Sequence, residues 1–87
     1  MPNEISEEVR IVQCRVGITT DPSTRKITWQ NEVVGFQNWQ ILKICKDRNE
    51  AQKYENYYAT RYGCQASPGG ADALGRWYVY YFNYIKE

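Results

Sequence analysis

Segment 14–29, which reads C-R-V-G-I-T-T-D-P-S-T-R-K-I-T-W, restricts the fold of this chain more than any other stretch. Alternating residues predict a strand that ends near Thr19, and Pro22 then opens a helix, because proline is tolerated in a first helical turn. Gly17 and Arg25 are thereby delivered to one strand–helix junction. Glycine permits close approach of a ligand or another backbone, and a helix N-terminus favours anions. On this stretch alone, an ordinary strand–helix connection is the simpler interpretation.

The hydrophobic pattern along the chain predicts one small α/β or α+β domain. The expected elements are strands at 8–19, 39–45 and 77–84 and helices at 22–32 and 48–62. They predict a three-stranded sheet with one layer of two helices, and the strand at 39–45 is apolar enough to be central. We expect residues 1–7 to form a polar leader before a domain that occupies residues 8–87.

The second helix has recognisable ends. Asp47 and, three residues later, Glu50 form a capping box, in which the two side chains satisfy main-chain N–H groups of the first turn. Gly63 is placed to end the helix in the left-handed conformation, which glycine adopts without steric cost. The sequence therefore predicts a helix that spans residues 48–62.

The composition excludes several classes of function. The chain has no histidine, so triads, general bases and metal sites that depend on histidine are excluded. Its 11 basic and 10 acidic residues give a net charge of +1, whereas domains that bind nucleic acid strongly through phosphates usually carry a clear basic excess. No apolar run approaches the roughly 20 residues of a membrane span. We expect no membrane partner and, with no signal-peptide pattern, a cytoplasmic location.

The number and spacing of the three cysteines argue against a disulfide framework and against a zinc site. Cys14, Cys45 and Cys64 are odd in number, lie far apart and lack C-x-x-C spacing. We expect them to be reduced and mostly buried thiols. A nucleophilic cysteine is disfavoured because no histidine is present to activate it.

One carboxylate falls on the face of the second helix that should be buried. The apolar members of that face are Ala51, Tyr54, Tyr58, Ala59 and Tyr62. Glu55 lies among them, although an unpaired buried charge is costly. Glu55 is therefore either a functional group or the partner of Arg25 or Arg15 in a structural ion pair.

These residues lie in motifs that resemble the GIY-YIG nuclease superfamily, over roughly residues 15–61. The matching stretches are V-G-I-T at 16–19, D-P-S-T-R at 21–25, W-Q-I-L at 39–42 and A-Q-K-Y-E at 51–55. The family's first strand, which carries the G-I-Y motif, has no counterpart before residue 9. The segment 77–84 looks like that strand, with Tyr78-Val79-Tyr80 in the G-I-Y positions.

The resemblance implies a circularly permuted domain whose C-terminal strand replaces the usual first strand. Permutation is tolerated where chain ends lie close together. The hypothesis predicts that segment 77–84 pairs antiparallel beside the strand at 8–19, and it fails if the two are unpaired.

The resemblance also implies roles for individual residues. Arg25 would clamp the phosphate, Glu55 would bind Mg²⁺ or Mn²⁺, and Tyr80 would accept a proton. Magnesium suits one carboxylate completed by waters and substrate oxygens. Further substrate contacts are expected from Arg15, Gly17, Trp29 and Tyr78.

Two departures from the family pattern weaken the expected catalysis. Arg15 replaces the first tyrosine of Y-I-G, and Trp29 replaces the histidine often found four residues after the arginine. Neither a guanidinium nor an indole can act as a base. Two functions stay open: a non-catalytic or weakened module that binds nucleic acid, a nucleotide or a partner protein, and an active metal-dependent endonuclease. We favour the first.

Overall fold

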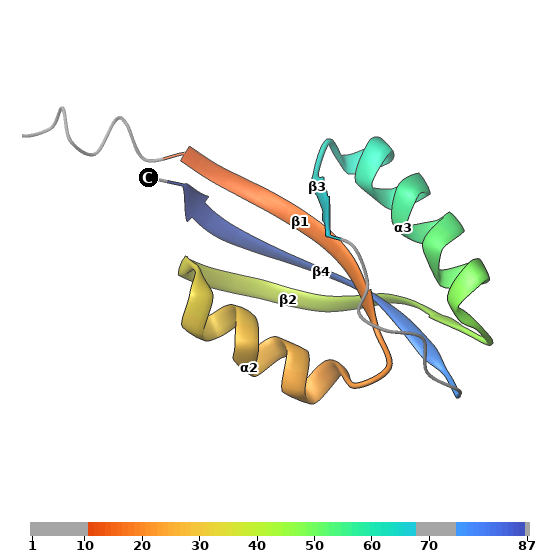
Figure 1. Cartoon of the computed structure of the whole chain (residues 1–87). Helices are drawn as coiled ribbons and strands as arrows, with labels where there is room; N and C mark the ends of the chain where they lie inside the picture. The colour runs from red at the N-terminus through yellow and green to blue at the C-terminus, as the bar shows by residue number, and fades with distance from the viewer. Residues whose placement is uncertain (1–10, 68–74, 87) are drawn as a thin grey trace, which may run out of the picture.

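A computed structural model describes residues 11–67 and 75–86 as a small α+β domain (Figure 1). The elements are β1 (Ile11–Thr19), α2 (Pro22–Glu32), β2 (Val34–Cys45), α3 (Arg48–Tyr62), β3 (Gln65–Ser67) and β4 (Trp77–Lys86). The α+β class and both helices are as predicted. The leader expected at residues 1–7 lies outside the described residues. The expected number of strands was wrong, because β3 is a three-residue strand too short to leave a hydrophobic pattern.

The sheet is mixed, with the strand order β2-β4-β1-β3. β4 pairs antiparallel with β1 and with β2, and β3 pairs parallel with β1. The predicted antiparallel pairing of segment 77–84 with the first strand is confirmed, with Gly17 directly opposite Tyr80. β2 is an edge strand, so its predicted central position was wrong. The apolar residues that suggested two neighbours include Ile41 and Ile44, which are exposed at this edge.

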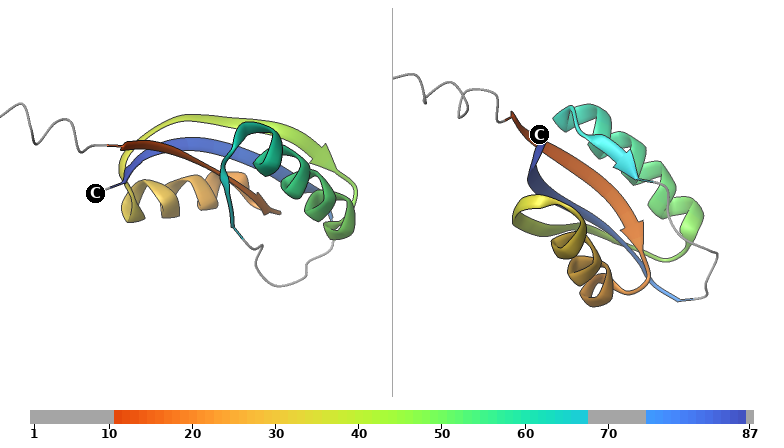
Figure 2. Two further views of the ribbon diagram at one scale, coloured as in Figure 1. Left: turned by 90° about the horizontal axis from the view of Figure 1, so that it is seen from above. Right: turned by 60° about the vertical axis from the view of Figure 1, so that its left-hand side comes forward.

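The two helices cover opposite faces of the sheet, and Figure 2 shows them toward different ends of it. Alternate residues of β4 divide between the faces: Trp77 and Val79 pack in the cluster with α3, whereas Tyr80 and Phe82 pack with residues of α2. The expected single helical layer was wrong. Because β4 is aromatic or branched at almost every position, both of its faces need a cover.

The predicted ends of α3 are confirmed. The Asp47 side chain accepts a hydrogen bond from the Glu50 main chain at 2.8 Å, and Glu50 Oε1 accepts one from the Lys46 main chain at 2.9 Å. Gly63 adopts the left-handed conformation with a φ of 67° and caps the last turn. The chain therefore turns sharply after α3 and places Cys64 beside β1.

Cys14 of β1 and Cys64 form a disulfide, with their Cα atoms 4.8 Å apart. The prediction of reduced thiols was wrong for this pair, because a long separation in sequence says nothing about the return of α3 to β1. Cys45 is a free, buried thiol, as predicted, and burial raises its pKa.

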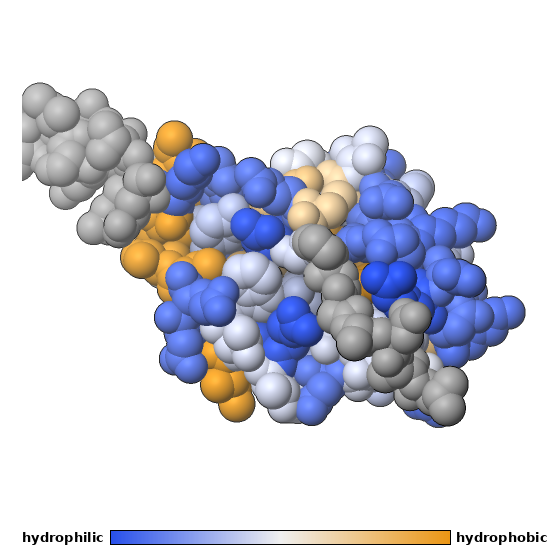
Figure 3. All heavy atoms as spheres, viewed as in Figure 1, coloured by the Kyte–Doolittle hydropathy of each residue, from blue (hydrophilic) through white to orange (hydrophobic). Residues whose placement is uncertain are grey.

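Most of the surface in the view of Figure 3 is hydrophilic, and a large apolar group lies at the end where β1 begins. Ile11, Val12 and Val34 are exposed at this end, where the starts of β1 and β2 flank the end of β4. No helix within residues 11–67 or 75–86 is long and apolar enough to cross a membrane.

Candidate functional site

The phenol of Tyr80 is the centre of the candidate site on the α2 face of the sheet. Tyr80 is fully buried, and its ring stacks on Trp39 with 4.9 Å between ring centroids. Trp29 Nε1 of α2 donates a hydrogen bond to Tyr80 Oη at 2.9 Å. The indole expected to contact substrate therefore binds the phenol expected to accept a proton.

Gly17 makes room for this phenol. A Cβ atom at Gly17 would lie 2.3 Å from Tyr80 Oη and 2.4 Å from Tyr80 Cζ. The sequence predicted that glycine permits a close approach, and the structure shows that the approaching group is the neighbouring strand's side chain. Gly17 therefore accommodates the Tyr80 phenol and is itself buried.

Arg15 is held on the same face by three contacts. Its guanidinium carbon lies 4.9 Å from the centre of the Trp29 ring and 5.6 Å from the centre of the Tyr84 ring. Its Nη1 donates a hydrogen bond to Ser67 Oγ of β3 at 2.8 Å. Cation–π contacts and a hydrogen bond together fix a side chain that would otherwise have many rotamers.

Arg25 lies one helical turn before Trp29 and is half-buried. The N-terminus of α2 is already occupied, because the Asp21 carboxylate accepts hydrogen bonds from the Thr24 main chain and hydroxyl. These hydrogen bonds lower the pKa of Asp21. The anion site expected at this helix end is thus filled from within the chain, and the positive charge available beside the phenol comes from Arg25 and Arg15.

Burial keeps the Tyr80 phenol from acting as a base. Burial raises the pKa of the Tyr80 phenol, against smaller lowering effects of the Trp29 hydrogen bond and the charges of Arg25 and Arg15. The charge of Glu55 raises this pKa further. Tyr80 therefore keeps its proton at neutral pH and acts as a hydrogen-bond donor or acceptor.

Glu55 approaches the site from α3, which packs on the other face of the sheet. Its side chain is 1% exposed, and Gln52 Nε2 donates a hydrogen bond to its Oε1. Burial raises the pKa of this carboxyl, while the Gln52 hydrogen bond, the charge of Arg48 and the main-chain N–H of Ser67 lower it. Glu55 Oε2 has no hydrogen-bond partner among the residues of the described ranges.

Ser67 of β3 interacts with a site residue on each face of the sheet. Its hydroxyl accepts the hydrogen bond from Arg15, and its main-chain N–H acts on the Glu55 carboxyl. The ion pair considered for Glu55 with Arg15 is thus replaced by an indirect link through Ser67. No sequence signal identified Ser67, because its role depends on the parallel pairing that places it opposite Gly17.

The structure brings together Arg15, Gly17, Trp29 and Tyr80, with Arg25 and Glu55 within electrostatic reach. Tyr78 lies on β4 two residues before Tyr80, opposite Thr19, and is half-buried. Among the described residues, no group of three or more acidic or cysteine side chains forms a metal site. Glu55 acts on this cluster through its charge, which raises the pKa of the Tyr80 phenol.

Replacing Glu55 with glutamine should stabilise the protein at neutral pH. The Glu55 carboxyl binds its proton more tightly in the folded state than in the unfolded chain, because its folded-state pKa is raised. Its contribution to the free energy of unfolding is therefore most favourable below the ordinary carboxyl pKa. That contribution is lost as the pH rises through the ordinary pKa toward the raised value. Glu55→Gln should remove this loss, so its melting temperature relative to wild type should increase from about pH 4 to about pH 7. Glu32→Gln, at the exposed end of α2, is the matched control; a pH-independent difference for Glu55→Gln would contradict the prediction.

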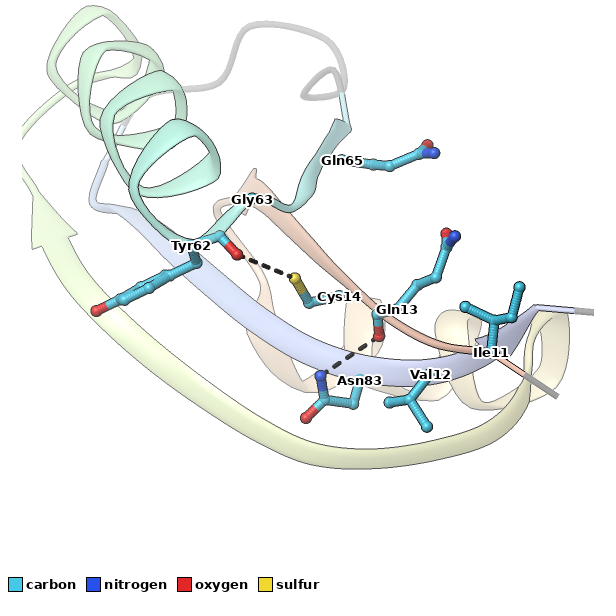
Figure 4. A pocket seen from close by; sticks show the side chains of 8 residues that line it. All are labelled: Ile11, Val12, Gln13, Cys14, Tyr62, Gly63, Gln65 and Asn83. Carbon is cyan, nitrogen blue, oxygen red and sulfur yellow. Dashed lines mark hydrogen bonds between the residues drawn. The ribbon is translucent and has the colours of Figure 1, made fainter. Parts of the chain in front are cut away.

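Two cavities lie away from this cluster. One of about 370 Å³ is lined by Gln40, Leu42, Tyr62 and Tyr81. The second, of about 420 Å³, lies beside the disulfide and is drawn in Figure 4. Comparison with family models, curated proteins and solved structures finds no match to this chain.

Proposed function

We propose that this domain is a circularly permuted GIY-YIG-like module that binds a phosphate-bearing ligand, a nucleic acid or a nucleotide, without cleaving it. The permutation is supported by the pairing of β4 between β1 and β2. It is supported further by the position of Tyr80 directly opposite Gly17, with Arg25 on the helix that follows.

The observation that carries the non-catalytic function is the state of the Tyr80 phenol. It is fully buried, it accepts a hydrogen bond from an indole, and its pKa is raised. A general base needs a pKa near the working pH and an open path to the proton that it removes. Arg15 and Trp29, at the other two positions where the family places proton-handling groups, supply no base.

Two guanidinium groups near one hydrogen-bonding phenol favour a phosphate ligand. Arg15 stacks on Trp29 of α2, and Arg25 lies one turn before Trp29 on the same helix. The charges of both arginines lower the pKa of the Tyr80 phenol. Arginine matches the geometry of phosphate oxygens and keeps its charge at all relevant pH values. Arg15 is oriented in advance by Trp29 and Tyr84, which lowers the entropy lost on binding.

The test is the affinity of the protein for fluorescently labelled single-stranded DNA and RNA and for a nucleoside triphosphate. Arg25→Gln should weaken binding by about tenfold or more, because a hydrogen bond to a charged group contributes roughly 1.5–3 kcal/mol. Arg61→Gln removes the same charge from the exposed end of α3 and is the matched control. Equal affinities for wild type, Arg25→Gln and Arg61→Gln would contradict a phosphate site at Arg25.

The alternative is an active endonuclease in which Glu55 holds Mg²⁺ or Mn²⁺. It is favoured by Glu55 Oε2, which is buried without a partner in the described part of the chain, and by the action of Glu55 and Arg25 on the same phenol. One carboxylate completed by waters and phosphate oxygens suits Mg²⁺. The raised pKa of Glu55 and the nearby charge of Arg48 oppose it, since both disfavour cation binding.

A partner protein is the other ligand that the domain would accept. Ile11, Val12 and Val34 form an exposed apolar end of the sheet, where the starts of β1 and β2 flank the end of β4. Retention of phosphate binding after mutation of these residues would separate the two surfaces. We keep the cytoplasmic location as part of this proposal.

A further inference from the structure

The Cys14–Cys64 disulfide joins the two chain segments whose contact holds Arg15. Cys14 immediately precedes Arg15 on β1, and Cys64 immediately precedes β3. The last residue of β3, Ser67, accepts the hydrogen bond that orients Arg15. The disulfide therefore fixes both chain segments whose contact positions the Arg15 guanidinium.

β3 depends on this bond for its place in the sheet. It has three residues, it lies at the edge of the sheet, and it pairs with β1 alone through residues 15–17. Gln65 and Ala66 are exposed, and only Ser67 of the three is buried. Short parallel edge strands have few hydrogen bonds and little buried surface to hold them in register. The covalent bond at Cys64 supplies the missing restraint.

The disulfide is open to chemical attack. Cys14 lines the cavity of about 420 Å³ together with Tyr62, Gly63 and Gln65, and Figure 4 shows its sulfur pointing toward the Tyr62 carbonyl among these residues. The sulfur lies 3.9 Å from the Tyr62 carbonyl oxygen, and both cysteines are only half-buried. A small thiolate can thus reach the bond from solvent without opening the core. Access of this kind separates labile disulfides from purely structural ones.

We propose that the Cys14–Cys64 disulfide is a thiol–disulfide switch that sets the phosphate affinity of the arginine site through Ser67; this inference rests on the function proposed above. One thiolate of a dithiol reductant attacks Cys14 Sγ, the S–S bond breaks, and Cys64 leaves as a thiolate that takes a proton. The second thiol of the reductant, as its thiolate, attacks its own sulfur in the mixed disulfide and releases Cys14, which takes a proton. Two electrons pass to the protein, and the dithiol becomes a disulfide.

Reduction removes the restraint on β3, so the Ser67 hydroxyl no longer holds Arg15. Arg15 keeps its contacts with Trp29 and Tyr84 but gains rotamer freedom, and phosphate binding then has to order it again. The oxidised protein is the tight-binding state. The predicted cytoplasmic environment keeps most thiols reduced, and disulfides found there are commonly redox-sensing.

Hydrogen exchange tests the structural half of the switch in the full chain. The Cys45→Ala variant should be used throughout, since it removes the one other thiol and leaves the disulfide pair. On reduction with dithiothreitol, confirmed by the mass gain of two hydrogens, the amides of residues 65–67 should exchange at least about tenfold faster. The amides of α2 and β4 should keep their protection. Unchanged exchange in β3, or loss of protection throughout the domain, would overturn the switch.

Affinity for a labelled oligonucleotide tests the functional half. Reduction should weaken binding about fivefold, as expected for the loss of one positioning hydrogen bond. Ser67→Ala should weaken binding of the oxidised protein by a similar factor, and its reduction should have no further effect. If reduction weakened oligonucleotide binding equally in the wild type and in Ser67→Ala, the disulfide would not act on Arg15 through Ser67. Absence of binding in both redox states would instead overturn the proposed function, and the exchange rates would still decide whether the disulfide controls β3.

Discussion

Gly17→Ala is expected to destabilise the domain by about 3 kcal/mol, at the upper end of the range for overpacked cores. The new Cβ would lie 2.3 Å from Tyr80 Oη and 2.4 Å from Cζ, which is far inside van der Waals contact. The Tyr80 ring cannot easily move away, because it stacks on Trp39 and Phe82 and accepts a hydrogen bond from Trp29. Thermal denaturation should show a melting temperature lower by roughly 12–24 °C for a domain of this size.

A double-mutant cycle distinguishes a clash between the new Cβ and the Tyr80 ring from a direct effect of alanine on β1. In a Tyr80→Leu background the large ring is absent, so Gly17→Ala should destabilise by less than about 1 kcal/mol. The coupling between the two positions is then the measured quantity. An equal loss in both backgrounds would show that alanine disturbs β1 itself, and that Gly17 does not serve to accommodate Tyr80.

Removal of the disulfide should have the second large effect. Cys14→Ser with Cys64→Ser should lower the free energy of unfolding by about 4 kcal/mol, the chain-entropy value for a loop of this length. The two cysteines are 50 residues apart in sequence, so the bond restricts much of the unfolded chain. Urea denaturation of the oxidised wild type and of the variants measures the difference.

The single variants provide the control for this prediction. Each of Cys14→Ser and Cys64→Ser breaks the same bond, so each should lose nearly as much stability as the double variant. Additive losses would mean that the two side chains stabilise the fold by separate packing, and that the bond contributes little. The measurement also shows whether the reduced domain stays folded, which the proposed switch requires.

Local features of the fold could be predicted because the signals lie close together in sequence. Pro22 opens α2, Asp47 and Glu50 cap α3, and Gly63 ends it, all as expected. Each depends on steric or hydrogen-bonding constraints between residues within one helical turn. The antiparallel pairing of segment 77–84 with β1 was also predicted, from the resemblance to the family's strand order.

The features that could not be predicted depend on distant parts of the chain. The disulfide forms because α3 returns to β1, and β3 forms because the chain after Gly63 runs beside β1. Neither event leaves a local signal. The same holds for Ser67, whose link between Arg15 and Glu55 follows from its register in the sheet.

The structure places several of the predicted site residues together and gives two of them structural contacts that the sequence did not indicate. Arg15, Gly17, Trp29 and Tyr80 do lie together, but Trp29 and Gly17 serve the buried phenol. Glu55 was expected to bind a metal or to pair with Arg25 or Arg15, and it lies on the helix that covers the other face of the sheet. The sequence motifs indicated these four residues, whereas the burial and the pKa of a side chain depend on all the groups that surround it in the fold.

Incubation of the protein with labelled single-stranded and double-stranded DNA and RNA in the presence of Mg²⁺ or Mn²⁺ tests the central claim most directly. The Glu55→Gln variant, which keeps the shape of the side chain and the acceptor for Gln52, is the control. We expect binding that depends on Arg25 and oligonucleotides that stay intact with either metal, for wild type and variant alike. Cleavage by the wild type that Glu55→Gln abolishes would contradict a non-catalytic site and establish the endonuclease instead.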